Sequence, residues 1–161
     1  MRILGVDPGL SATGYAIVEI AGRNLSLIEA GVIKPANKVT ELGGKLKAIY
    51  ADFMSLIEEF KPEQCAIEEL YSHYQHPRTA IIMGHCRGTI MLACAQADLQ
   101  IHSFNATKIK KTVTGNGRAS KEQVSASVTR YFNLEKPPTP ADVTDAMAAA
   151  MTLANEIMHG Y

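Results

Sequence analysis

The sequence predicts an α/β domain with a mixed five-stranded sheet and helices packed on it. Short apolar runs bounded by turn residues open the chain, and later runs alternate with segments whose apolar residues recur at three- and four-residue steps. The length of 161 residues suffices for one domain with a sizeable core. We therefore expect one domain over residues 1–161.

Three strands are expected at the start of the chain. Residues 2–7 form an apolar run that ends in a Pro-Gly turn, and two further strand-like runs cover residues 13–20 and 25–33. The connections between these runs are short, and short connections favour antiparallel neighbours. The first three strands should form a meander.

Helices and strands then alternate. Residues 40–60 have helical spacing, so the strand after them, residues 64–70, should run parallel to the first strand. The remaining expected elements are a helix from Pro77 to about Ala97, a strand over 99–104, a helix from Ser120 to about Phe132 and a helix over about 140–158. The order is βββαβαβαα, to which residues 108–113 can add a short helix.

The composition excludes several classes of protein. No apolar run approaches the roughly 18 residues of a membrane span, and the N-terminus lacks a signal-peptide pattern, so we expect a cytoplasmic protein without membrane contact. Three cysteines without a Cys-x-x-Cys pair argue against a disulfide framework and a zinc site. A catalytic pair of Cys86 with His85 is disfavoured, because sequence neighbours rarely form one.

Charge is unevenly distributed along a chain of zero net charge. Residues 70–121 carry seven basic side chains against one acidic side chain, and the segments on either side are net acidic. The basic residues are Arg78, Arg87, Lys108, Lys110, Lys111, Arg118 and Lys121. This middle segment can bind a polyanion on one face, although a surface on which the charges mix in three dimensions explains the composition equally well.

Two acids stand where buried, parallel strands are expected to end. Asp7 closes the first strand and Glu68 lies near the end of the fourth, so both should project at one edge of the sheet. Each also has a simpler explanation. Asp7 can cap the turn that follows it, and Glu68 can face water as Glu69 can.

Two more acids lie on the last predicted helix. Asp142 and Asp145 are three residues apart, so they share a helix face that borders the apolar stripe. Asp142 can instead stabilise the helix start, with Thr139 as N-cap and Pro140 in the first helical position. Asp145 lies deeper in the helix and is harder to explain in this way.

Carboxylates that converge in this way repel one another without cations, and Mg²⁺ prefers oxygen ligands. Two such ions about 4 Å apart can activate a water and stabilise the leaving 3′ oxygen in phosphodiester hydrolysis. A nearby lysine can meet the charge that develops on the phosphate. The acids therefore indicate a metal-dependent nuclease.

With these residues the chain resembles the RuvC family of Holliday junction resolvases, over nearly its whole length. The matching segments are Gly5–Tyr15, Ala66–Tyr71, Gly84–Gly88, Lys110–Gly115 with Gly117–Lys121, and Ala141–Ala146. The resemblance implies an RNase H-like fold and a crossover junction endodeoxyribonuclease. Such an enzyme makes paired symmetric nicks in four-way junction DNA during recombination and repair.

The resemblance also assigns roles to residues. Asp7, Glu68, Asp142 and Asp145 fall on the family's metal-binding acids, although relatives can carry His at the position of Asp142. Lys121, with Lys110, falls on basic residues used near the scissile phosphate, and we count Lys121 among the catalytic residues. Tyr71 stands where the family often has a Phe that stacks on unpaired bases. The expected DNA-binding residues are Tyr71, Arg78, Lys108, Lys110, Lys111, Arg118 and Lys121.

The implied cofactor is Mg²⁺, two ions per subunit, for which Mn²⁺ can substitute. The implied partners are four-way junction DNA, a second copy of the chain in a homodimer, and the branch-migration proteins RuvA and RuvB. Gly84 and Gly88 lie four apart on a predicted helix and are candidates for the dimer contact, because small residues permit close approach. Packing against the chain's own sheet explains them as well.

Two other functions remain open at this point. One is a fragment of an actin-like or sugar-kinase-type phosphotransferase, whose phosphate loop also follows a first strand with an Asp-x-Gly pattern like that of Asp7-Pro8-Gly9. Those proteins are usually well over twice this length. The other is a junction-binding protein without catalysis, and the presence of all four acids argues against it.

Overall fold

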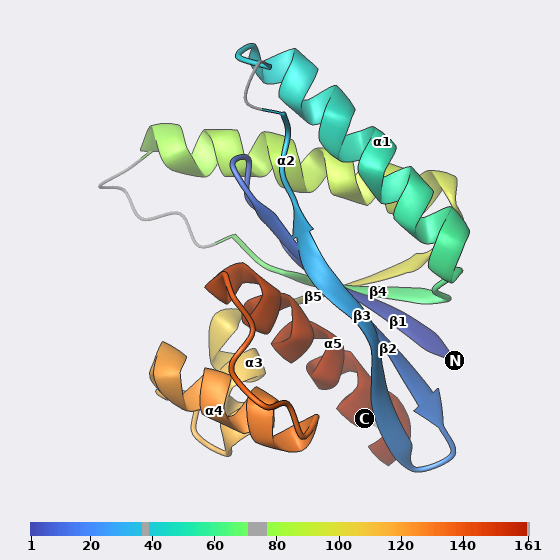
Figure 1. Cartoon of the computed structure of the whole chain (residues 1–161), viewed down its shortest axis with the longest axis vertical. Coiled ribbons are helices and arrows are strands. Elements are labelled where there is room, and N and C mark those ends of the chain that lie inside the picture. Colours follow the sequence, from blue (N-terminus) through green and yellow to red (C-terminus); the bar gives the residue numbers. More distant parts are fainter. Residues whose placement is uncertain (37–38, 71–76, 161) are drawn as a thin grey trace.

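The computed structural model describes the chain except residues 37–38, 71–76 and 161. Its strands are β1 (Arg2–Asp7), β2 (Thr13–Ala21), β3 (Asn24–Ile33), β4 (Gln64–Glu68) and β5 (Gln100–Phe104). Its helices are α1 (Leu42–Phe60), α2 (Pro77–Gln96), α3 (Ala106–Thr114), α4 (Lys121–Tyr131) and α5 (Ala141–His159). The strands form one sheet in the order β3-β2-β1-β4-β5, with α1 and α2 on one face and α3, α4 and α5 on the other (Figure 1).

The strand directions confirm the predicted fold class. β1 pairs antiparallel with β2, and β2 with β3, whereas β4 runs parallel to β1 and β5 parallel to β4. Some boundaries were wrong, among them those of α3 and β4. Residues 106–114 form a full helix, capped by the Asn105 side chain, which accepts a hydrogen bond from the Lys108 amide. β4 ends at Glu68 rather than at residue 70, because its ladder with β1 stops at Ile67 and leaves a neighbour on one side only.

Side chains that point alternately to the two faces of the sheet divide the core into two layers. Leu4 and Val6 of β1 pack with α1 and α2, whereas Ile3 packs with α5. β4 alternates in the same way, with Cys65 and Ile67 in the layer of α1 and α2. Since successive side chains point to opposite faces of a sheet, the residues between these belong to the face of α5.

α5 lies unusually close to the sheet because glycines make room for it. A Cβ at Gly5 would stand 2.2 Å from the carbonyl oxygen of Ala146, and one at Gly14 would stand 1.9 Å from that of Asp142. Gly5 is flanked in the sheet by Ala16 and Ala66, so the strip under the helix has only small side chains. The depth of α5 is therefore set by the absence of side chains on β1 and β2.

The helix starts agree in part with the predicted caps. Ser120 and Gln123 form the predicted capping box at the start of α4. At α5 the N-cap is Pro140 rather than Thr139, and no side chain caps the helix, so Asp142 occupies the second helical position. α1 begins at Leu42 instead of residue 40, because Glu41 is still extended.

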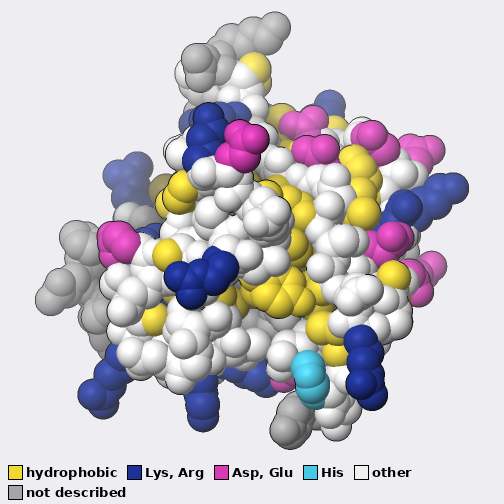
Figure 2. All heavy atoms as spheres, turned by 60° about the horizontal axis from the view of Figure 1, so that its bottom comes forward, with side chains coloured by type: hydrophobic (Ala, Val, Ile, Leu, Met, Phe, Trp, Pro, Cys, Tyr) yellow, Lys and Arg dark blue, Asp and Glu magenta, His cyan; other side chains and the backbone are white. Residues whose placement is uncertain are grey.

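The lower face of the molecule in Figure 1 is shown in front in Figure 2. Lysine and arginine side chains are spread around this face, acidic ones gather mainly on one side, and an apolar area lies open near its centre.

All three cysteines are buried, and none forms a disulfide. Among the described residues no helix is long and apolar enough to cross a membrane.

Candidate active site

The alternating side-chain directions along β1 and along β4 explain why two acids from distant segments meet. Asp7 continues the face of Ile3 and Gly5, and Glu68 continues the face of Ala66, so both carboxylates point to the side of α5. Glu69, one residue later, is exposed. The parallel pairing brings the ends of the two strands to the same edge, so Asp7 and Glu68 lie on the same side of the sheet, whereas Glu69 lines the cleft from a more exposed position.

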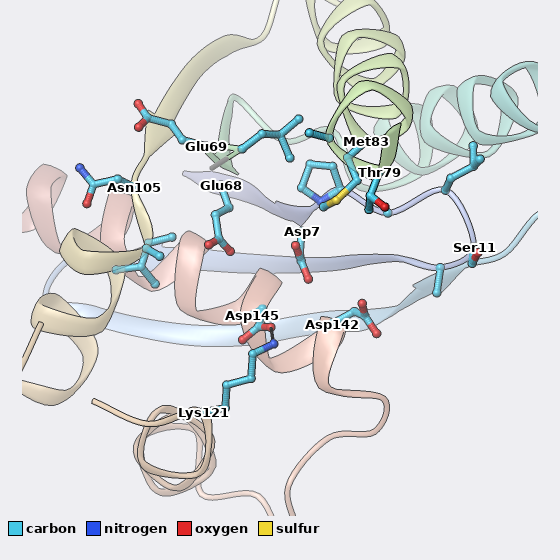
Figure 3. Close-up of a pocket in the computed structure, with 18 of the residues that line it drawn as sticks. Asp7, Ser11, Glu68, Glu69, Thr79, Met83, Asn105, Lys121, Asp142 and Asp145 are labelled. Carbon is cyan, nitrogen blue, oxygen red and sulfur yellow. Dashed lines mark hydrogen bonds and ion pairs between the residues drawn. The ribbon is translucent and has the colours of Figure 1, made fainter. Parts of the chain in front are cut away.

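α5 adds the other two acids. Asp145 and Asp142 lie on its first two turns, and both line the cleft of about 1300 Å³ that Asp7 and Glu68 also line. In Figure 3 Asp7 and Glu68 point across the cleft toward Asp145, whereas the Asp142 carboxylate is turned aside. The structure thus brings together the four acids singled out from the sequence.

The turn after Asp7 is held by a buried threonine. The Thr13 hydroxyl donates a hydrogen bond to the Gly9 carbonyl oxygen at 2.6 Å and accepts one from the Gly9 amide at 3.3 Å. Gly9 has no room for a side chain, because a Cβ there would stand 2.2 Å from the Ala12 carbonyl oxygen. This closed turn fixes the point at which the chain leaves β1 beside the Asp7 carboxylate.

The acids perturb one another strongly. Burial, followed by the negative charges of Asp145, Glu68 and Asp142, raises the pKa of Asp7 from 3.8 to about 7, and the Lys121 ammonium opposes this. Burial and then Asp145 raise the pKa of Glu68, while Lys121 and Lys110 lower it. Burial and mutual repulsion therefore disfavour the ionised forms of Asp7 and Glu68.

Lys121 is the nearest compensating charge. Its Nζ lies 3.4 Å from Asp145 Oδ2, and the charge of Asp145 is the main cause that raises the pKa of Lys121. The lysine side chain is 75% exposed, so it can leave this ion pair at little cost. Lys121 comes from the start of α4, which explains how a residue far from β1 in sequence reaches the cleft.

The donor set fits a hard divalent cation, because all four acids offer carboxylate oxygens. In the described part of the chain, no three His, Cys, Asp or Glu side chains already stand close enough to hold one ion together.

The other predicted DNA-binding residues take different positions. Lys110 lines the cleft, and Arg78, Lys111 and Arg118 are exposed outside its lining. Lys108 forms an ion pair with Glu156 of α5, and its Nζ lies 5.1 Å from the centre of the Phe104 ring. Tyr71 lies outside the described residues.

Sequence reasoning missed one residue beside the site. Arg87 of α2 has no predicted role in the site, but its Nε donates a hydrogen bond to the main-chain carbonyl of Glu68 at 3.3 Å. A contact from a helix side chain to the backbone of a distant strand leaves no periodic pattern. The sequence signals for it are its charge and its place in the matching segment Gly84–Gly88.

Comparison with known proteins first defines the class. The yeast mitochondrial Holliday junction resolvase Ydc2 matches with a TM-score of 0.68 at 12% identity, over 98% of this chain and 80% of that one. At this identity the likeness shows the fold alone. Together with the strand order, it defines an RNase H-like fold.

The family follows from closer matches. A sequence model described as Crossover junction endodeoxyribonuclease RuvC matches residues 3–153. The protein of that description from Rhodopirellula baltica is 46% identical over 149 residues, which are 92% of this chain and 83% of the relative. Thermus thermophilus RuvC, solved in complex with Holliday junction substrate, matches with a TM-score of 0.90 at 27% identity, over 99% of this chain and 96% of that one. The chain belongs to the RuvC family, whose members are metal-dependent nucleases.

Proposed function

We propose that this chain is a structure-selective endonuclease that resolves Holliday junctions, with Asp7, Glu68, Asp142 and Asp145 as ligands of Mg²⁺. The observation that carries the proposal is the meeting of these carboxylates, from β1, β4 and α5, in one cleft with Lys110 and Lys121. Binding two Mg²⁺ ions, for which Mn²⁺ can substitute, would offset the burial and the repulsion that together raise the pKa of Asp7.

The chain's own groups divide the work of phosphodiester hydrolysis. Bound divalent ions would activate a water and stabilise the leaving 3′ oxygen. The raised pKa of Asp7 lets it hold a proton near pH 7, which it would release to solvent when a cation binds. Asp7 and Glu68 would then both offer carboxylate oxygens on the α5 side of the sheet. Lys121 moves from Asp145 toward the phosphate and offsets its developing negative charge.

A basic rim gives the DNA a path to this cleft. Lys110 and Lys121 lie in its lining, and Lys111 and Arg118 are exposed close to them in sequence, on and after α3. We assign these residues, with Arg78 and Lys108, to the DNA backbone, and Tyr71 to unpaired bases at the junction. Lys108 would have to exchange Glu156 for a phosphate.

Lys121→Ala is expected to slow cutting by about 10- to 100-fold, because the nearest mobile cation is removed from the reacting phosphate. It should also reduce the slope of log Kd against log salt by about 1, as for one lost phosphate contact. Lys47→Ala, which removes an exposed lysine from α1, is the matched control. An unchanged salt slope in Lys121→Ala would take this residue off the DNA surface.

A homodimer suits a substrate that has two equivalent strands to cut. α2 offers a surface for it: Ile81 is 61% and Leu92 54% exposed, and a Cβ at Gly84 or Gly88 would meet nothing within 4 Å. Packing against the sheet therefore does not explain these glycines. We propose that two copies meet through this face of α2, and that the dimer works with RuvA and RuvB in the cytoplasm.

The dimer contact predicts that Ile81→Glu converts the protein to a monomer, because a charge would be buried in an apolar helix contact. Light scattering after size exclusion measures the mass directly. Ile28→Glu on β3, where the parent side chain is 40% exposed, is the control and should remain a dimer. A monomeric parent, or an Ile81→Glu dimer at the same concentration, would contradict this contact.

The proposed activity is tested with a labelled four-way junction and a linear duplex of the same arms, each with Mg²⁺ and with EDTA. We expect two symmetric nicks in the junction with Mg²⁺, no cutting in EDTA, and little cutting of the duplex. Binding without any cutting would favour a junction-binding protein. ATP hydrolysis without nicking would favour a phosphotransferase of the actin-like class.

A further inference from the structure

Arg87 connects α2 to the ends of two strands beside the site. Its Nε donates to the Glu68 carbonyl oxygen at 3.3 Å, and its second terminal nitrogen donates to Ser103 Oγ of β5 at 2.7 Å. The remaining terminal nitrogen contacts Met91 Sδ at 3.2 Å, one turn along α2. One guanidinium thus joins a helix, the last residue of β4 and the adjacent strand.

The end of β4 needs such a support. Pairing with β1 stops at Ile67, so Glu68 lies beside β5 alone, opposite Phe104. The next amide, that of Glu69, donates to the Phe104 carbonyl oxygen at 2.9 Å. The hydrogen bond from Arg87 acts on the other group of the same peptide unit, so the plane of the Glu68–Glu69 peptide is held at both its N–H and its C=O.

Arg87 acts on Glu68 through the backbone rather than through charge. The charged groups that perturb the Glu68 carboxyl are Asp145, Lys121 and Lys110, and Arg87 is not among them. Within the described residues no carboxylate forms an ion pair with Arg87. The hydrogen bonds of this partly buried guanidinium go to neutral oxygens and a thioether.

We propose that Arg87 is a positioning residue that fixes the backbone of Glu68 and so aims its carboxylate into the cation site. A planar guanidinium can hold two acceptors on two strands in fixed directions, which a lysine ammonium on a flexible stem cannot do. The inference rests on the proposed role of Glu68 as a cation ligand. It adds a residue that touches neither cation nor DNA.

The sign of the effect on cation binding separates positioning from electrostatics. If Arg87 acted by its charge, then Arg87→Met would remove a repelling cation and tighten divalent binding. If it positions Glu68, the same change weakens binding, because groups that orient metal ligands typically contribute about 10-fold or more to affinity. Arg87→Lys keeps the charge and only one of the two strand contacts, so it should fall between parent and Arg87→Met.

The experiment is calorimetric titration of the metal-free protein with Mn²⁺, without DNA. The variants are Arg87→Met, Arg87→Lys and Ser103→Ala, with Glu68→Gln as reference and Arg23→Met, in the turn between β2 and β3, as control. We expect Mn²⁺ binding about 10-fold weaker in Arg87→Met, weakened less in Arg87→Lys and Ser103→Ala, and unchanged in Arg23→Met. Junction binding in EDTA should equal that of the parent.

Each result decides the inference. Mn²⁺ binding in Arg87→Met as tight as in the parent, or tighter, overturns it, provided that Glu68→Gln has lost affinity. If Glu68→Gln itself binds like the parent, the proposed cation site fails, whatever Arg87 does. If circular dichroism shows that Arg87→Met does not fold, the milder variants Arg87→Lys and Ser103→Ala are measured instead. Weaker Mn²⁺ binding in them supports the inference, and binding as tight as in the parent or tighter overturns it.

Discussion

Asp7→Asn is expected to lower the rate of junction cutting by about 10³-fold or more while junction binding is kept. Asp7 lies on the central strand β1 and faces both Glu68 and Asp145, so it is placed to share any cation held between β4 and α5. Asn keeps the shape of the side chain but loses the charge that binds a hard cation. The basic residues of α3 and α4 that we propose for DNA binding are left in place.

Single-turnover cutting of a labelled junction in Mg²⁺ measures the rate, and a mobility-shift titration in EDTA measures the binding. Asp52→Asn, on the exposed side of α1, is the matched control and should cut like the parent. A variant that loses binding together with cutting would point to a damaged fold. A variant that cuts at the parent rate would remove Asp7 from the site.

The same substitution should stabilise the metal-free protein at neutral and alkaline pH. The folded-state pKa of Asp7 is about 7 against 3.8 for the ordinary group, so between these values the folded chain binds more protons than the unfolded chain. The free energy of unfolding of the parent therefore falls as pH rises from about 4 to 7, by up to about 4 kcal/mol from this group. In EDTA at pH 8 we expect a Tm for Asp7→Asn at least about 5 °C above the parent, and little difference near pH 4.

The strand and helix order was predictable because its signals are local. Apolar runs bounded by turn residues, helical spacing and the capping box of Ser120 with Gln123 each depend on neighbours in sequence. The parallel pairing of β4 with β1 followed from the intervening helix, and it placed Asp7 and Glu68 at one edge. The acids could therefore be found before any coordinates, once Asp142 and Asp145 were seen to share a helix face.

What the sequence did not reveal depends on contacts between distant segments. Nothing local shows that Lys108 pairs with Glu156, or that Arg87 holds the Glu68 carbonyl. The pairing of β4 with β1 stops at Ile67, and the N-cap of α5 is Pro140 rather than Thr139. Both depend on packing, which a single-sequence pattern does not encode.

Among the glycines of this chain, Gly14→Ala should have the largest effect, because its new Cβ would make the shortest contact. The new Cβ would stand 1.9 Å from the Asp142 carbonyl oxygen, whereas an ordinary contact exceeds 3 Å, so the first turn of α5 must retreat by about an ångström or more. β2 cannot yield instead, because Gly14 is paired on both sides, with Asp7 and with Val32. We expect a loss of about 3 kcal/mol in the free energy of unfolding.

The loss of activity should exceed what the loss of stability explains. The retreat of α5 carries Asp142 and Asp145 away from Asp7, and a displacement of about 1 Å in a catalytic group can cost about 10²-fold in rate. Cutting is measured at a temperature where circular dichroism shows the variant folded. Gly43→Ala, in the first turn of α1 where a Cβ meets nothing within 4 Å, is the control and should be neutral or slightly stabilising. Parent-like Tm and cutting in Gly14→Ala would mean that α5 does not depend on this glycine for its depth, and that the acids on it are positioned in another way.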